Sequence, residues 1–296
     1  MEMTPRNIRL NGVELAYAEW GEANEKKPSL LFVHATGFHG RVWDRIIESF
    51  EDFHIVALDQ RGHGRSEKLA CDNWKTYGDD IAALVRALDL KNAIGIGHSM
   101  GGHALVDGAA QAQCFSRLLL LDPTIFEPAR YLSPHLADNV ELAAENPAAR
   151  RRNRFSSVAE MMKRLGSKSS FPLFEPRMFH DYCEFGLVPS PEGDLQLACP
   201  PAIEAQIYQT AISNSRIYDS VSALSIPVFV VRARQGVRKS TSDFLNSPTW
   251  AELATAFSMG KDLYLEDCSH FIPMERPDLV VALLREEVDA VLRTRH

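Results

Sequence analysis

The sequence lacks several features that would place it in a specialised class of protein. Its five cysteines are scattered without Cys-x-x-Cys spacing, and their odd number argues against a disulfide framework and against a zinc site. No apolar run approaches the length of about 20 residues that a membrane-spanning helix requires. The first residues contain no basic segment followed by an apolar core, so we expect no signal peptide. These absences favour a reduced, cytoplasmic protein.

An excess of positive charge is also absent. Lysine and arginine together number 32 against 39 aspartate and glutamate residues, which gives a formal net charge of −7. Binding of nucleic acid requires a basic face, so this balance argues against nucleic acid as the main partner. We expect a small-molecule substrate and no membrane partner, metal or organic cofactor. The sequence leaves both a monomer and a homodimer open.

What the sequence does contain is a regular alternation of short apolar runs and helical patterns. An Asn11-Gly12 dipeptide between two alternating segments predicts an N-terminal hairpin. Buried strands are predicted at 30–33, 54–59, 93–97, 118–121, 226–231 and 262–265, and helices at 77–90, 249–257 and 277–293. Since parallel strands need crossover connections, this order predicts an α/β fold with a doubly wound, mostly parallel sheet.

The alternation breaks in the middle of the 296-residue chain. We therefore expect a core domain made of residues 1–125 and 220–296, with residues 126–219 inserted as a helical cap. This insertion carries a basic cluster, Arg150-Arg151-Arg152-Asn153-Arg154. Its simplest interpretation is a solvated helix face, and the alternative is that one arginine faces a cleft and binds an acidic substrate.

The strongest chemical signal is Gly97-His98-Ser99-Met100-Gly101, which follows an apolar strand and leads into a helix. In that context a serine is held on a sharp turn with its hydroxyl exposed, and the two glycines allow strand and helix to approach. Ser99 is therefore predicted to be a nucleophile. The backbone N–H of Met100 is predicted to be one donor of an oxyanion hole.

A serine nucleophile needs a base, and an acid that orients the base. His270 follows the last predicted strand, so it emerges at the same sheet edge as Ser99 and is the candidate base. Thr36, in the loop after the strand at 30–33, is the candidate for the second backbone donor of the oxyanion hole. His63 and His103 are expected to have packing roles.

Taken together, these motifs resemble those of an α/β-hydrolase with a helical cap. The matching pieces, in order, are His34-Ala35-Thr36-Gly37-Phe38, Asp59-Gln60-Arg61-Gly62-His63-Gly64-Arg65-Ser66, Gly97–Gly102 and Ser269-His270-Phe271. The resemblance implies the α/β-hydrolase fold and says little about the substrate.

The position of the acid departs from the family pattern. Most members place a carboxylate directly after the strand that corresponds to 226–231, and here none occurs there before Asp243. Some branches place the acid at the end of the strand after the elbow helix, which here is Asp122. We favour Asp122, keep Asp243 as the alternative, and rank Glu127 third.

The predicted function is a serine hydrolase that cleaves a small, largely apolar carboxylic ester or lactone through an acyl-enzyme. The alternative within catalysis is hydrolysis of a carbon–carbon bond, or cofactor-free dioxygenation, with the same histidine–acid pair. A third hypothesis is a non-catalytic binding protein with a hydrolase-like fold.

Overall fold

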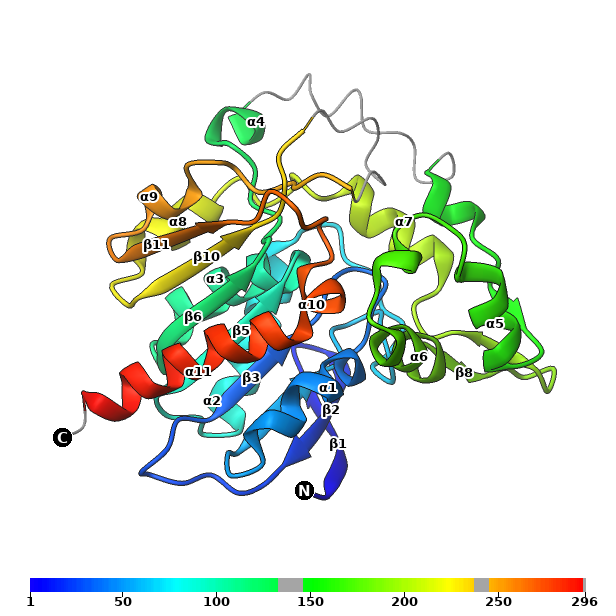
Figure 1. The fold of residues 1–296 in the computed structure, drawn as a ribbon, viewed down its shortest axis with the longest axis horizontal. Helices are drawn as coiled ribbons and strands as arrows, with labels where there is room; N and C mark the ends of the chain where they lie inside the picture. The colour runs from blue at the N-terminus through cyan, green and yellow to red at the C-terminus, as the bar shows by residue number, and fades with distance from the viewer. Residues whose placement is uncertain (133–145, 237–244, 295–296) are drawn as a thin grey trace.

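The computed structural model describes residues 1–132, 146–236 and 245–294. An eight-stranded sheet in the order β1-β2-β4-β3-β5-β6-β10-β11 forms its centre (Figure 1). The strands are β1 (Met3–Leu10), β2 (Val13–Trp20), β3 (Leu30–Val33), β4 (Ile55–Leu58), β5 (Ala93–His98), β6 (Phe115–Leu121), β10 (Val228–Arg232) and β11 (Gly260–Tyr264). All neighbours from β4 to β11 pair in parallel, which confirms the predicted fold class.

The antiparallel edge of the sheet is the hairpin predicted at Asn11-Gly12. Leu10 pairs with Val13, so the turn has two residues, and both have positive φ, 50° at Asn11 and 75° at Gly12. Such a turn matches the twist of the strands it joins. Strand β2 then pairs antiparallel with β4 and connects the hairpin to the parallel strands.

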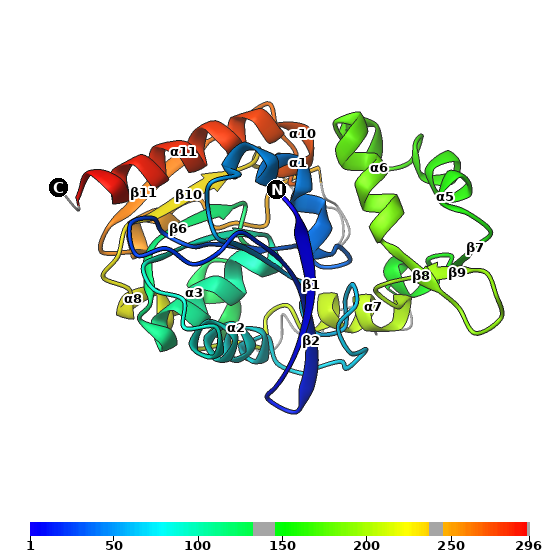
Figure 2. The same ribbon diagram turned by 90° about the horizontal axis from the view of Figure 1, so that it is seen from below.

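Helices cover both faces of the sheet (Figure 2). One face carries α2 (Lys75–Ala87), α3 (Met100–Ala112), α8 (Ile217–Ala223) and α9 (Leu253–Ala256), whose apolar side chains share one buried cluster. The other face carries α1 (Asp44–Ile47), α10 (Ile272–Glu275) and α11 (Pro277–Arg293), which share a second cluster. Strands β3, β4 and β5 are buried along their whole length, as a doubly wound sheet requires, whereas the edge strands β1 and β11 are largely exposed.

Between β6 and β10 the chain leaves this pattern. It forms α4 (Pro128–Leu132), α5 (Val158–Leu165), α6 (Pro176–Phe185) and α7 (Pro201–Gln209), with a small antiparallel sheet of β7 (Arg154–Phe155), β9 (Leu195–Leu197) and β8 (Leu187–Pro189). In Figure 1 α5, α6 and β8 lie to one side of the central sheet. The sequence predicted helices here but not the small sheet, whose strands are only two or three residues long.

The basic cluster at 150–154 is not a helix face, so that interpretation was wrong. A 3₁₀ turn ends at Arg150, and Arg154 begins β7. Arg154 pairs with Asp194, whereas Arg151 is directed inward to Glu204.

Among the helices that the structure describes, none combines the length and apolar character of a membrane span.

Candidate active site

Ser99 lies on a strained turn between β5 and α3. Its φ of 57° and ψ of −118° are unfavourable for a residue with a side chain, and such strain is typical of functional sites. The flanking glycines are required by contact. A Cβ on Gly97 would lie 2.7 Å from the Gly101 carbonyl oxygen, and a Cβ on Gly101 would collide with the carbonyl oxygen of Val33. The turn therefore depends on both glycines.

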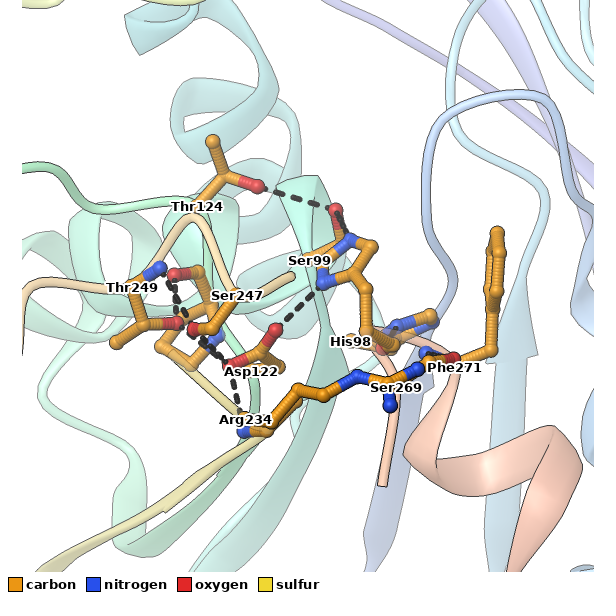
Figure 3. A network of polar contacts seen from close by, with 12 residues as sticks. His98, Ser99, Asp122, Thr124, Arg234, Ser247, Thr249, Ser269 and Phe271 are labelled. Atoms are coloured by element: carbon orange, nitrogen blue, oxygen red, sulfur yellow. Dashed lines mark hydrogen bonds and ion pairs between the residues drawn. The ribbon is translucent and has the colours of Figure 1, made fainter. Parts of the chain in front are cut away.

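The structure brings Ser99, His270 and Asp122 into one hydrogen-bonded chain. Ser99 Oγ lies 2.9 Å from His270 Nε2, and His270 Nδ1 lies 2.6 Å from Asp122 Oδ2. The three residues are 7%, 3% and 0% exposed, respectively. A carboxylate accepts only, so Nδ1 carries the proton and Nε2 accepts from the serine hydroxyl. Figure 3 shows Ser99 and Asp122 at the ends of neighbouring strands.

Asp122 is held by donors from the loops that follow β10. Its Oδ1 accepts from the backbone N–H of Ala233 at 2.9 Å and from Ser247 Oγ at 2.5 Å (Figure 3). It also lies 3.1 Å from Thr249 Oγ1, whose single proton is shared with the Pro123 carbonyl oxygen at 2.7 Å. Its own φ is 45°, a left-handed conformation that aspartate tolerates. Most members of the family have their acid in the loop after β10. Here that loop instead supplies hydrogen-bond donors to Asp122, which lies at the end of the neighbouring strand β6.

The other two candidate acids are not at this position. Asp243 lies outside the described residues, and Glu127 is exposed at the surface. The helix predicted at 249–257 is also shorter than expected, because α9 begins only at Leu253. Thr249 therefore lies in a loop, where its hydroxyl reaches Asp122. The roles of Ser247 and Thr249 were not predicted, since single hydroxyl residues in a loop give no specific signal in the sequence.

Thr124 is a third residue whose role in the site was not predicted from the sequence. Its Oγ1 lies 3.1 Å from Ser99 Oγ, and its backbone N–H donates to the Ser99 carbonyl oxygen at 3.0 Å (Figure 3). Because the Ser99 hydroxyl donates to His270, the Thr124 hydroxyl must be the donor toward Ser99 Oγ. Ser99 Oγ is therefore held by two partners at once.

His98 and His103, on either side of the nucleophile, are both buried. His98 Nε2 donates to the carbonyl oxygen of His270 at 2.8 Å, and burial together with the nearby His270 holds the pKa of His98 well below its usual value. His103 Nδ1 donates to the Thr124 carbonyl oxygen at 3.0 Å, and burial lowers the pKa of His103 to about 4. Both are neutral supports of loops in the site.

The predicted oxyanion donors, Thr36 and Met100, lie next to each other, since Thr36 Oγ1 is 3.4 Å from Met100 Sδ. The following N–H groups are already used, that of Gly37 by His63 Nε2 at 3.0 Å and that of Phe38 by the Ala35 carbonyl oxygen at 3.1 Å. Within the described residues the N–H groups of Thr36 and Met100 have no acceptor, although both residues are buried. Two buried donors are thus free for a ligand oxygen.

A cavity of about 280 Å³ adjoins these loops. Its lining includes Thr36, Phe38 and Phe271 from the loops of the central sheet. The remaining lining residues come from the segment between β6 and β10: Pro147, Ala148, Arg151, Ser169, Ser170, Phe171, Tyr182, Glu204 and Tyr208. Across the described residues, no group of three or more His, Cys, Asp or Glu side chains could hold a metal ion.

Comparisons with known proteins identify the family. Residues 30–283 match the model of the alpha/beta hydrolase family. Lipase LipV of Mycobacterium tuberculosis is 24% identical over 274 residues, which cover 88% of this chain and 92% of the lipase. A non-heme chloroperoxidase of Streptomyces lividans is 34% identical over 106 residues, 35% of this chain. That match spans only 38% of the chloroperoxidase.

Two solved structures have the same fold. One is an E-2-(acetamidomethylene)succinate hydrolase, with a TM-score of 0.76 and 23% identity, and the match covers 97% of this chain and all of that one. The other is a thermophilic esterase from Thermogutta terrifontis, with a TM-score of 0.67, 23% identity and coverage of 97% and 99%. The family match covers most of the chain and includes Ser99, Asp122 and His270. This protein belongs to the alpha/beta hydrolase family.

Proposed function

We propose that this protein is a serine hydrolase that cleaves a small, largely apolar carboxylic ester or lactone. The observation that carries the proposal is the buried chain from Ser99 Oγ through His270 to Asp122, with distances of 2.9 and 2.6 Å. This order of nucleophile, base and acid is the arrangement that activates a serine hydroxyl. Lipase LipV and the thermophilic esterase are named for their action on esters, which supports the same chemistry.

In the proposed first half-reaction, Ser99 Oγ attacks the ester carbonyl carbon while its proton moves to His270 Nε2. The carbonyl oxygen becomes an oxyanion that accepts hydrogen bonds from the backbone N–H groups of Thr36 and Met100. The carbon–oxygen bond of the leaving group then breaks, and His270 returns the proton to the departing alcohol. Asp122 orients the imidazole and stabilises its protonated form.

In the second half-reaction, water attacks the acyl-enzyme with His270 again as the base. The carboxylic acid leaves, and the proton returns to Ser99. On this proposal residues 126–219 are a cap over the core of 1–125 and 220–296, and the cavity between them receives part of the substrate. The apolar side chains of Phe38, Phe171 and Phe271 favour an apolar substrate in that cavity.

The test is covalent labelling with a serine-directed fluorophosphonate, followed by peptide mass spectrometry. We expect one adduct at Ser99 and none in Ser99→Ala. Loss of about 10³- to 10⁴-fold in ester turnover is expected for Asp122→Asn, as for triad acids elsewhere. Asp243→Asn is the matched control and should remain active. Absence of a Ser99 adduct would refute the proposal and favour a binding protein.

A further inference from the structure

The cavity beside the oxyanion loop contains one ion pair in an otherwise largely apolar and aromatic wall. Arg151 Nη1 lies 2.5 Å from Glu204 Oε2, and Arg151 Nη2 donates to the Tyr182 hydroxyl at 2.9 Å. The Glu204 side chain is 5% exposed and that of Arg151 is 25% exposed. Both residues line the cavity, and Arg151 is the more accessible member of the pair.

This ion pair lies directly against the loop that carries Thr36. Gly37 has a φ of 79°, and a Cβ there would lie 2.9 Å from Glu204 Oε1 and 3.5 Å from Arg151 Nη1. The absence of a side chain at position 37 therefore lets the pair approach the oxyanion loop. A substrate whose carbonyl oxygen is bound by the Thr36 N–H can thus extend along the cavity to Arg151.

Arg151 has hydrogen-bonding capacity that the protein does not use. A guanidinium has five N–H groups, and the bonds to Glu204 and Tyr182 use two. The other three have no acceptor among the residues that the structure describes. Burial by itself would lower the pKa of Arg151, but the Glu204 carboxylate and Tyr182 raise it well above the usual value. Arg151 is therefore a permanent donor that needs an oxygen acceptor.

The charge of that acceptor follows from Glu204. The guanidinium is already neutralised, so a carboxylate bound beside it would lose its hydration and gain little net attraction, while Glu204 repels it. An uncharged carbonyl oxygen has a smaller desolvation penalty and still accepts a charge-assisted hydrogen bond. The ion pair with Glu204 thus leaves Arg151 able to donate hydrogen bonds to a substrate but disfavours binding of an anionic group.

From these contacts we infer that the preferred substrate carries, besides the ester or lactone that is cleaved, a second and uncharged carbonyl group such as an amide, which Arg151 binds. This inference rests on the proposed function. It opposes the alternative, drawn from the sequence, that an arginine of this cluster binds an acidic substrate.

The test compares matched esters that differ only in the remote group. In the first series the remote group lies on the acyl side, and the substrates are methyl heptanoate, methyl 4-acetamidobutanoate and monomethyl glutarate. In the second series the acyl group is always butanoate, and the alcohol carries the same alkyl, acetamido or carboxylate end. In the series whose variable part enters the cavity, we expect kcat/KM for the amide ester to exceed that for the alkyl ester, and to exceed that for the carboxylate ester at least tenfold. A carboxylate preferred over the amide, or equal to it, in both series would overturn the inference.

Two variants test the role of the ion pair. Glu204→Gln removes the repelling charge and should improve the carboxylate ester at least tenfold relative to the amide ester. The double variant Arg151→Met with Glu204→Gln leaves no buried charge unpaired and should lose the preference of amide over alkyl. Arg150→Met is the matched control, because Arg150 is exposed and its substitution removes the same charge. An unchanged amide preference in the double variant would refute the assignment to Arg151.

A binding measurement separates this inference from the proposed function. Calorimetry with the Ser99→Ala variant and the three methyl esters reports occupancy of the cavity without turnover. Tighter binding of the amide than of the carboxylate would support the inference even if no ester were hydrolysed and Ser99 were not labelled. Tighter binding of the carboxylate would refute it whatever the catalytic result.

Discussion

Thr124 Oγ1 lies 3.1 Å from Ser99 Oγ, and the backbone N–H of Thr124 donates to the Ser99 carbonyl oxygen. Thr124 thus contacts the nucleophile through both its side chain and its backbone. Its hydroxyl donates to Ser99 Oγ, which leaves the serine proton directed toward His270 Nε2. This contact restricts the rotation of the Ser99 side chain before any substrate binds.

We predict that Thr124→Val lowers kcat/KM for ester hydrolysis about five- to tenfold, which corresponds to loss of one hydrogen bond of about 1 kcal/mol. Valine keeps the shape of threonine, and the backbone contacts remain. Thr124→Ser restores the hydroxyl and should recover most of the activity. Rates of fluorophosphonate labelling provide an independent measurement. Full activity in Thr124→Val would show that the hydroxyl has no role.

A second prediction concerns the donors to Asp122. Ser247→Ala removes the bond at 2.5 Å to Oδ1 and the acceptor of the Thr249 N–H, and it leaves the bond from the Ala233 N–H. We expect kcat to fall about tenfold, less than in Asp122→Asn, because the carboxylate stays but its orientation is less restricted. Ser258→Ala, where the hydroxyl instead donates to the Leu224 carbonyl oxygen, is the control. A Ser247→Ala enzyme as active as the control would contradict this prediction.

The third prediction concerns His98, which anchors the carbonyl oxygen of His270. In His98→Phe the donor is lost, so we expect kcat to fall about 10- to 100-fold as the base moves from its position. KM should change little, since His98 does not line the cavity. His180→Phe replaces a histidine whose side chain is 52% exposed on α6 and serves as control. A change confined to KM would argue against a positioning role.

The fourth prediction is a dependence of stability on pH. The pKa of His103 is about 4 in the folded protein, against about 6.5 when unfolded. Between these values only the unfolded chain binds the proton, so this residue lowers the free energy of unfolding by about 1.4 kcal/mol for each pH unit of decrease. The contribution of His103 is complete above pH 6.5 and is lost as the pH falls toward 4.

Urea unfolding of the wild type and of His103→Gln between pH 7.5 and 4.5 measures this contribution. Glutamine cannot titrate, so the slope of the free energy of unfolding against pH should decrease by about 1.4 kcal/mol per unit below pH 6.5. Equal slopes in the two proteins would refute the assignment. Activity at pH 7.5 serves to show that the variant retains its fold.

The features that sequence could predict are those with a local chemical cause. Apolar runs gave the parallel strands, Asn11-Gly12 gave the hairpin, and the glycines around Ser99 gave the turn. The expectation that Asp122 lies near His270 also came from topology, because neighbouring parallel strands end at the same sheet edge.

Features that depend on distant contacts were not predictable. Ser247 and Thr249, whose hydroxyl groups contact Asp122, follow it by 125 and 127 residues. Nothing in their local sequence indicates this contact. A helix was even predicted to begin at Thr249. Likewise, a run of arginines indicated a solvated surface, but the partner that turns Arg151 inward is Glu204, 53 residues away. Pairing at such separations is decided by the tertiary fold.

The groups that satisfy Asp122 have a consequence for biosynthesis. The N–H of Ala233, the hydroxyl of Ser247 and the imidazole of His270 follow Asp122 by 111, 125 and 148 residues. A fragment that ends before β10 therefore has a carboxylate at Asp122 with none of these partners. On the proposed function, we expect such a fragment to be inactive toward esters. On the proposed function, Ser99 therefore becomes an active nucleophile only in a chain that extends through His270.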